Sequence, residues 1–339
     1  TTNILSNINV GGNATLATDG TLDVKGANVV TGGALVADAA KINVEAVVDS
    51  ATAASTTVKK SGGFLSSKKV TTTSNATDQS VVSSTLSGDT ISLRSSGDTN
   101  ILGSNVVATN GVDIKAGGNV TIGTVAATDT SEQSQKRKKS GLSLSGGGLF
   151  VGVAKNATSS STTAVTNTGS LVGASNGDVA IIAGDKLTVK GSTVAASGDT
   201  SLVGESVEIT NATDTVDTKT TSKSSSFGVT ISASSPLANG VQTAVRAGEI
   251  ATSDAANDRT KAVAALAGGL SAKNTIDAVK QDPKALGGVN LSASLGISKS
   301  SSSSESHDET VIGSLIQGEN VNIIATGNGA AGSGSVRVT

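Results

Sequence analysis

Short runs in which apolar and polar residues alternate recur along this chain, and Gly, Asn or Asp bounds each run. Alternation with a period of two is typical of β-strands that bury one face. Apolar positions also recur at a lag of about twenty residues, which leaves room for three short strands in each interval. The pairs that show the lag are Leu187–Val207, Val189–Ile209 and Ile182–Leu202 at twenty, and Leu93–Ile114 and Ile101–Ile122 at twenty-one.

A longer repeated phrase opens on a glycine followed by Asn, Asp or Glu, at Gly12, Gly88, Gly177 and Gly318. A unit of this kind cannot bury its apolar face alone and must stack on its neighbours. The pattern predicts an all-β fold, a right-handed parallel β-helix (β-solenoid) whose coils stack about 4.8 Å apart. We expect ladders of Val, Ile and Leu inside, and Gly, Asn and Asp at corners with positive φ. A β-sandwich of short strands, the alternative, would not need a fixed lag.

After every two coils the pattern changes to a polar stretch, an apolar alternation and a Ser/Thr-rich return. We expect these segments to be long β-hairpin excursions that pair along the outside of the solenoid. Their apolar positions are Leu142, Leu144, Leu149, Val151 and Val153 in the second copy, Phe227, Val229 and Ile231 in the third, and Val289, Leu291, Leu295 and Ile297 in the fourth. Residues 58–73 occupy the same place in the first copy, with weaker alternation.

One excursion contains a stretch in which the apolar period changes from two to 3.6. Residues 236–288 carry spaced Val, Ile, Leu and Ala, with Ser253, Asp254 and Asn274 as helix-capping residues. This predicts a small α-helical insertion. The chain then has three parts. Residues 1–235 form solenoid coils with hairpin excursions, residues 236–288 form the insertion, and residues 289–339 form a returning excursion strand and further coil.

The composition favours thin layers over a bulky core, because aromatic residues are 1% of the chain and 41 of its 339 residues are Gly. A net charge of -2 gives no footprint for nucleic acid. The chain has no Cys for disulfides or thiolate metal sites, and no apolar run long enough for a membrane-spanning helix. No signal peptide is visible, and the absence of Met indicates a piece from the interior of a longer protein. We expect no cofactor and no metal.

Nothing in the sequence favours a catalytic centre. The only histidine, His307, lies between Ser306 and Asp308, and consecutive residues of a strand face opposite ways, so they cannot form a triad. Acidic residues sit next to Gly at predicted corners, where Asp forms turns. These are Asp89, Asp98, Asp178, Asp185 and Asp199. A glycan-active β-helix enzyme with carboxylates in one groove remains the alternative from another class.

The densest charge run is Lys136, Arg137, Lys138 and Lys139. We interpret it as gatekeeper charge on a hairpin strand, which prevents edge-to-edge pairing. The alternative is contact with phosphates of lipopolysaccharide or with acidic surface glycans. The apolar excursion strands also allow two interpretations: packing on the solenoid wall, which we favour, or a membrane-inserting hairpin. The surface-contact candidates are therefore Lys136, Arg137, Lys138, Lys139, Leu142, Leu144, Phe150, Phe227, Val229 and Ile231.

The coil phrases at residues 184–194 and 117–122 resemble the haemagglutinin repeats of filamentous-haemagglutinin-like exoproteins, as do the Ser-rich excursions at 140–145 and 226–230. These exoproteins leave Gram-negative bacteria by two-partner secretion. Coils with long polar excursions are most similar to the second repeat region of contact-dependent growth inhibition effectors. No family secretion motif and no toxin-boundary motif is present, so the resemblance assigns neither export nor toxicity to this segment.

The resemblance implies a non-enzymatic, monomeric rod-like stalk, secreted or on the cell surface. It implies adhesion to a target-cell surface or outer membrane, help in passing a toxin across that membrane, and an outer-membrane transporter as partner of the parent protein. The family has no catalytic residues in this region to carry over. A purely structural spacer is the remaining alternative.

Overall fold

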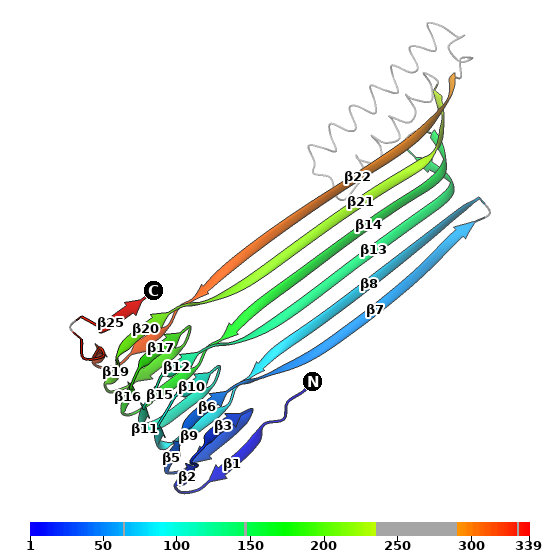
Figure 1. The fold of residues 1–339 in the computed structure, drawn as a ribbon. Helices are drawn as coiled ribbons and strands as arrows, with labels where there is room; N and C mark the ends of the chain where they lie inside the picture. The colour runs from blue at the N-terminus through cyan, green and yellow to red at the C-terminus, as the bar shows by residue number, and fades with distance from the viewer. Residues whose placement is uncertain (64, 146–147, 235–289, 331) are drawn as a thin grey trace, which may run out of the picture.

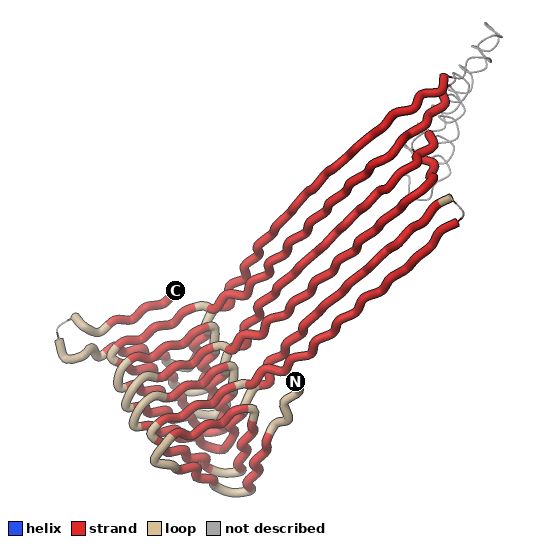
Figure 2. The backbone as a smooth tube through the Cα atoms, turned by 45° about the vertical axis from the view of Figure 1, so that its right-hand side comes forward, coloured by secondary structure: helices blue, strands red, loops and turns tan. Residues whose placement is uncertain are grey.

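The computed structural model describes residues 1–63, 65–145, 148–234, 290–330 and 332–339. In this part of the chain two bodies of β-structure join along one corner, a parallel β-helix and a long antiparallel sheet that projects from it (Figures 1 and 2). Seven coils stack in the β-helix, and each contributes one strand to each of three parallel faces. The parallel β-helix predicted from the lag is confirmed.

The three faces consist of short strands in parallel register. The first face contains β1 (Ser6–Val10), β4 (Ala27–Thr31), the first parts of β9 (Thr85–Ser95) and β11 (Asn105–Ala116), β15 (Leu171–Ala174), β18 (Thr193–Ala196) and β23 (Leu315–Gln317). The second contains β2 (Ala14–Ala17), β5 (Ala34–Ala39), the later parts of β9 and β11, β16 (Asp178–Ala183), β19 (Thr200–Gly204) and β24 (Val321–Ala325). The third contains β3 (Thr21–Lys25), β6 (Lys41–Glu45), β10 (Thr99–Leu102), β12 (Val120–Gly123), β17 (Lys186–Lys190), β20 (Ser206–Thr210) and β25 (Ser335–Val338).

The core is built from ladders in which one apolar residue per coil stacks on its equivalent in the next. On the third face one ladder runs through all seven coils, as Val24, Val44, Ile101, Ile122, Val189, Ile209 and Val338. Four of the five predicted pairs stack as expected. The pair Ile182–Leu202 is wrong: Leu202 stacks on Ile181, which is fully buried, whereas Ile182 pairs with Val203 and is 37% exposed. On this face the lag is twenty-one.

At the corner between the third face and the first, the chain either turns directly into the next coil or leaves the solenoid as a long hairpin, and these two connections alternate from coil to coil. Where it continues directly into the next coil, the corner residue is Gly26, Gly103 or Gly191, each with a φ between 53° and 59°. A side chain there would also collide with the neighbouring coil, since a Cβ on Gly191 would lie 2.6 Å from the Cβ of Ala212. Positive φ and lack of room both require glycine.

The prediction that Asn and Asp also supply positive-φ corners is wrong, because no non-glycine residue in the described chain has positive φ. These side chains instead accept hydrogen bonds from the coil above. Asp98 Oδ1 accepts from the Asn119 N–H at 2.9 Å, and Asp178 Oδ1 accepts from the Asp199 N–H at 2.8 Å. The backbone and side-chain amides of Asn119 lower the pKa of the Asp98 carboxyl.

A ladder of serines supports the same corner from within. The hydroxyl of Ser170 accepts the Ser104 N–H at 3.2 Å and donates toward the Gly123 carbonyl at 2.7 Å. Ser192 accepts the Ser170 N–H in turn, and Ser314 accepts the Ser192 N–H. Backbone groups that lose a sheet partner where the chain turns are satisfied in this way.

After the second, fourth and sixth coils the chain leaves this corner as a long hairpin. The hairpins are β7 (Val47–Gly63) with β8 (Ser66–Val82), β13 (Val125–Ser145) with β14 (Gly148–Thr168), and β21 (Ala212–Ser234) with β22 (Asn290–Ile312). They pair with one another as one six-stranded antiparallel sheet in the order β22-β21-β14-β13-β8-β7 (Figure 1). The hairpins are as predicted, but their pairing along the outside of the solenoid is wrong, because the sheet points away from the coils (Figure 2).

The spacing of the coils explains why the hairpins meet. Two coils advance the chain by two strand spacings, about 9.6 Å, which is the width of a two-stranded hairpin. Hairpins that leave one corner every second coil therefore arrive side by side at hydrogen-bonding distance. Neighbours are joined at the base by an aspartate: Asp214 Oδ1 accepts the Asn167 N–H at 2.7 Å, and Asp129 Oδ1 accepts the Gln79 N–H at 2.6 Å.

The start of the chain repeats the contact made by Asn167. Asn3 donates its backbone N–H and its side-chain amide to Asp49 Oδ1, each at 2.7 Å, and Thr1 and Ser50 exchange backbone hydrogen bonds. The segment at residues 1–3 thus lies beside β7 as the end of β14 lies beside β21.

The α-helical insertion predicted for residues 236–288 lies outside the described residues. Within the described chain, no helix has the length and apolarity needed to cross a membrane.

Candidate contact surface

The hairpin sheet is a single layer, so both of its faces are open to solvent along most of its length. Successive residues of a strand point to opposite faces, and residues directly opposed on neighbouring strands share a face. We call the face that carries Lys138 the front face and the face that carries Arg137 the back face. The register then assigns the side chain of each described residue to one of them.

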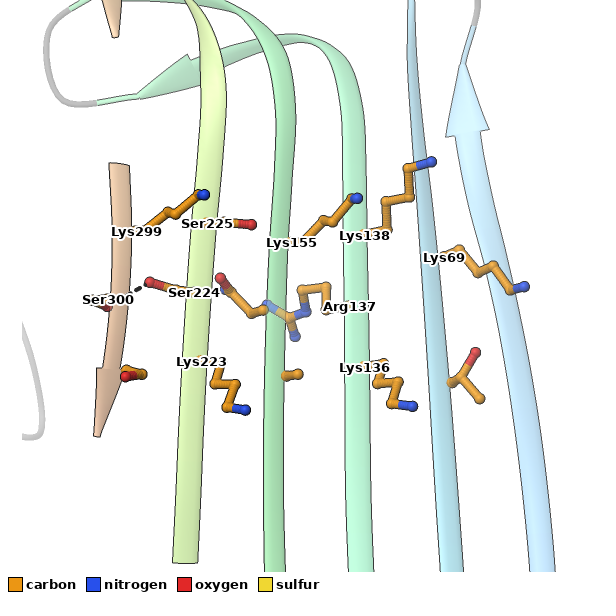
Figure 3. Close-up of a pocket in the computed structure, with 14 residues that line it drawn as sticks. Lys69, Lys136, Arg137, Lys138, Lys155, Lys223, Ser224, Ser225, Lys299 and Ser300 are labelled. Carbon is orange, nitrogen blue, oxygen red and sulfur yellow. Dashed lines mark hydrogen bonds between the residues drawn. The ribbon is translucent and has the colours of Figure 1, made fainter. Parts of the chain in front are cut away.

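A row of lysines crosses the front face. Lys60 is opposed to Lys69, Lys69 to Lys138, and Lys138 to Lys155. The row continues through Ser225 to Lys299, so five of six strands contribute a lysine at one level. Figure 3 shows the side chains of Lys138, Lys155 and Lys299 extending the same way and that of Lys69 turning aside on the neighbouring strand.

A second, shorter row lies one step nearer the solenoid. Lys136 and Lys223 flank Ala157 from the two neighbouring strands. All three residues line a depression of about 720 Å³. Figure 3 shows the side chains of Lys136 and Lys223 at this depression. The lysine rows are these two levels of the front face, Lys60, Lys69, Lys138, Lys155 and Lys299 with Lys136 and Lys223.

The lysine rows have no counter-charge from the protein. In the part of the chain that the structure describes, none of their amino groups is within 4.0 Å of a carboxylate. Like charges placed directly opposite one another destabilise a sheet. The rows therefore cost stability in the isolated chain and are suited to an anionic partner.

Beyond the lysine rows, toward the hairpin ends, the front face becomes apolar. The next level contains Val153, Phe227 and Ile297, and the one after it contains Leu142, Val151, Val229 and Leu295. Several are highly exposed: Phe227 is 55%, Leu295 70% and Ile297 71% exposed. We call these two levels the apolar rows. Such an exposed apolar surface on a thin sheet indicates contact with another body.

The structure separates the ten candidates that the sequence suggested. Lys136, Lys138, Leu142, Phe227 and Val229 lie on the front face, and Arg137, Lys139 and Phe150 on the back. Leu144 and Ile231 lie on β13 and β21, and their side chains are outside the described set.

Phe150 has a structural role on the back face. A Cβ added to Gly152 would lie 2.7 Å from the Phe150 ring, and one added to Gly228 would lie 2.6 Å from it. The ring therefore covers two glycines that offer no side chain of their own.

Two favoured interpretations of these residues are wrong. The gatekeeper explanation needs an edge strand, but β13 pairs with both β8 and β14 and is an interior strand. The apolar strands were expected to pack on the solenoid wall, but they lie at the far ends of the hairpins and outside the solenoid core cluster (Figure 1).

Five members of the lysine rows were not among the sequence candidates: Lys60, Lys69, Lys155, Lys223 and Lys299. The first and the last of them are 239 positions apart in the sequence. For two of them the sequence carried a signal in their distance from an apolar run: Lys155 follows Val153 and Lys299 follows Ile297, each by two residues and therefore on the same face. Only the pairing of the hairpins brings these lysines together on two neighbouring levels of one face.

His307 lies on β22 near the base of the sheet, where two carboxylates hold it. Its Nδ1 is 2.6 Å from Asp217 Oδ1, and its Nε2 is 3.0 Å from Glu309 Oε1. The hydrogen bonds that the His307 ring donates to Asp217 first and to Glu309 second raise the pKa of His307 to about 9. A histidine that stays protonated at neutral pH is an ion-pair partner and a poor general base. Among the described residues, no group of three His, Cys, Asp or Glu side chains is placed to hold a metal.

Coils of 20 to 22 residues that carry a hairpin after every second coil define a repeat-built β-solenoid. Comparison with known proteins gives the family. The family model described as Hemagglutinin repeat matches residues 1–138 and 151–293, so the chain belongs to the hemagglutinin-repeat family.

Curated relatives agree. The chain is similar to a protein named deoxyribonuclease CdiA from Yersinia pseudotuberculosis, 36% identical over 70% of this chain and 23% of the relative. It is 33% identical to a tRNA nuclease CdiA from Burkholderia pseudomallei over 78% of this chain and 22% of that protein, and 34% identical to a toxin CdiA from Yersinia pestis over 69% and 7%.

The chain thus spans less than a quarter of the relatives it matches, and their names describe whole proteins. No solved structure matches it.

Proposed function

We propose that this chain is a non-enzymatic segment of a large exoprotein, secreted or on the surface of a Gram-negative bacterium. In this proposal the solenoid is a rod that gives reach, and the hairpin sheet contacts the target cell. The family and the similarity to CdiA proteins support the setting. They also support a two-partner secretion transporter as the partner of the parent protein, and a role in passing a toxin to the target.

One observation carries the assignment of contact to the sheet. The solenoid buries its apolar ladders without help from the hairpins, yet the chain devotes six strands of 17 to 23 residues to a layer that adds little to that core. A spacer needs only the coils. Unpaired lysines and exposed apolar side chains on that layer are features of a binding surface.

The corner glycines provide a clean experiment. Gly103 connects two coils without an excursion, and its equivalents at the hairpin exits are Ala46, Thr124 and Asn211. Each hairpin can therefore be replaced by a single glycine, in place of residues 46–83, 124–169 and 211–313. We expect a full-length exoprotein with these replacements to reach the cell surface at normal levels and to bind target cells at least tenfold less.

The measurement pairs antibody accessibility of the exoprotein on intact cells with co-sedimentation of producer and target cells. Growth inhibition of the target reports toxin delivery in the same strains. Unchanged target binding with the hairpins removed would leave a purely structural spacer as the function. Activity on acidic polysaccharides by the purified chain would instead favour the glycan-active enzyme.

A further inference from the structure

We infer that the front face of the hairpin sheet is a binding site for an anionic lipid surface, with the lysine rows on its phosphate groups and the apolar rows below them. This inference rests on the proposal that the sheet contacts the target, and it names the chemistry of the surface. The observation that supports the inference is the order of the levels along the front face, two of lysines followed by two of apolar side chains.

The levels have the order and spacing of a bilayer interface. Neighbouring levels of one face are two residues apart along the strand, about 6.7 Å. The two lysine levels are followed directly by the two apolar levels. A lysine side chain reaches several ångströms from its backbone and keeps its amino group at the headgroups. Phe227, Leu295 and Ile297 then lie where an interfacial element places its apolar side chains, just below the headgroups.

Charge along the hairpins is segregated in the same direction. The outer segments, residues 56–72, 133–161, 220–234 and 290–304, contain no Asp or Glu. The carboxylates of the hairpins lie nearer the solenoid, where Asp217, Glu305 and Glu309 are found on β21 and β22. An anionic surface attracts the outer half of the sheet and repels the inner half, so it orients the sheet with its far end toward the lipid.

Other partners fit the face less well. A soluble polyanion would satisfy the lysine rows but would leave Phe227, Leu295 and Ile297 in water. A second copy could cover the apolar rows, but its matching outer segments would bring further lysines and no carboxylate. Only a surface that is anionic at one level and apolar at the next satisfies both sets of rows.

The back face supplies a matched control. Lys59, Lys68, Arg137 and Lys139 lie on the back face of the same sheet, within one residue of the longer lysine row. A front variant, K69Q/K138Q/K155Q/K299Q, and a back variant, K59Q/K68Q/R137Q/K139Q, remove equal charge from the same outer half of the sheet. Binding through one face separates the two variants, whereas general electrostatic attraction does not.

The experiment measures co-sedimentation of the purified 339-residue chain with vesicles of phosphatidylglycerol and phosphatidylethanolamine, and with vesicles of phosphatidylcholine alone. Each lysine at an anionic surface contributes about 1 kcal/mol, which is about fivefold in affinity. We expect the front variant to bind the anionic vesicles at least 100-fold more weakly and the back variant less than fivefold more weakly. The unmodified chain should bind phosphatidylcholine weakly.

A third variant, F227S/I297S, tests the apolar rows. We expect it to lose at least tenfold in vesicle affinity while its affinity for polyphosphate in solution is unchanged. Circular dichroism and the melting temperature confirm folding, because all substituted residues lie outside the solenoid core.

Three results would overturn the inference: equal losses in the front and back variants, vesicle binding unaffected by F227S/I297S, or front-face-dependent dimerisation in sedimentation velocity without vesicle binding. Failure here is distinguishable from failure of the proposed function. Front-specific vesicle binding together with unchanged target-cell contact after hairpin removal would keep the site and reject its role. The opposite pair of results would keep the role and reject lipid as the partner.

Discussion

The solenoid and the hairpin sheet are made of the same material, hydrogen-bonded β-strands, but they are stabilised in different ways. In the solenoid every second side chain enters a closed interior, and residues such as Ile114, Leu187 and Leu202 are completely buried. Among the residues that the structure describes, nothing packs on either face of the sheet to give it an interior. A β-sheet can therefore extend far beyond the hydrophobic core when its side chains are compatible with solvent on both faces.

The side chains of the sheet show how it tolerates water. Ser and Thr dominate it, and they pair across strands through their hydroxyls, which contributes a few tenths of a kcal/mol per pair. The pairs are Thr52–Thr77, Thr56–Thr73, Ser67–Ser140, Ser160–Thr220, Thr162–Thr218 and Ser224–Ser300. Weak hydroxyl contacts between exposed side chains thus take the place of the buried apolar ladders of the solenoid.

The largest expected difference between the two regions is in the cost of truncating an isoleucine to alanine. Ile114 is fully buried in a core ladder, so Ile114→Ala should reduce the free energy of unfolding by about 3–5 kcal/mol. Ile297 on the sheet is 71% exposed, and Ile297→Ala should change it by less than about 0.5 kcal/mol. Urea denaturation followed by circular dichroism measures both. Similar losses at the two sites would mean that the sheet has a covered interior in solution.

The second largest effect is expected at a corner glycine. Gly191→Ala combines a left-handed backbone, about 1–2 kcal/mol, with a Cβ forced against Ala212, about 1–3 kcal/mol. We expect a loss of about 3 kcal/mol in the free energy of unfolding. Gly12→Ala is the matched control, because a Cβ there meets nothing within 4 Å and φ is not positive. If the Gly191→Ala protein were as stable as the Gly12→Ala control, the conclusion that this corner requires glycine would be wrong.

The smallest effect should be a dependence of sheet stability on pH. The pKa of His307 is about 9 in the folded chain and near 6.5 when unfolded, so the folded state favours the proton. The stabilisation is complete below about pH 6.5 and is lost as the pH rises through about 9. The melting temperature of the unmodified chain should therefore be lower at pH 10 than at pH 6. His307→Gln should reduce this difference between the two melting temperatures. A decline of equal size in the variant would assign it to other groups.

Much of the solenoid could be predicted because its signal is local and repeated. The lag that links Ile101 to Ile122 is the register itself, and the apolar alternation fixes which side chains enter the core. Ile182 was misplaced because Ile181 and Ile182 are both apolar, and the sequence does not show which of two adjacent isoleucines points inward.

Less of the contact surface could be predicted, because it depends on pairing between hairpins. The run from Lys136 to Lys139 was visible, but alternation divides it between two faces. Lys299 joins Lys138 in one row only through three intervening strand pairings. Asp217 and His307, ninety residues apart, meet for the same reason.

Because two coils advance the chain by the width of one hairpin, two coils with one hairpin form the smallest unit that can be added or removed without changing the strand register. Duplicating the unit lengthens the rod by about 10 Å and widens the sheet by two strands, with every register preserved. Loss of a single coil would instead leave the flanking hairpins a strand spacing out of step and uncouple the sheet. We therefore expect the chain to accept gain or loss of whole units only, so that the reach of the rod and the contact area of the sheet change together.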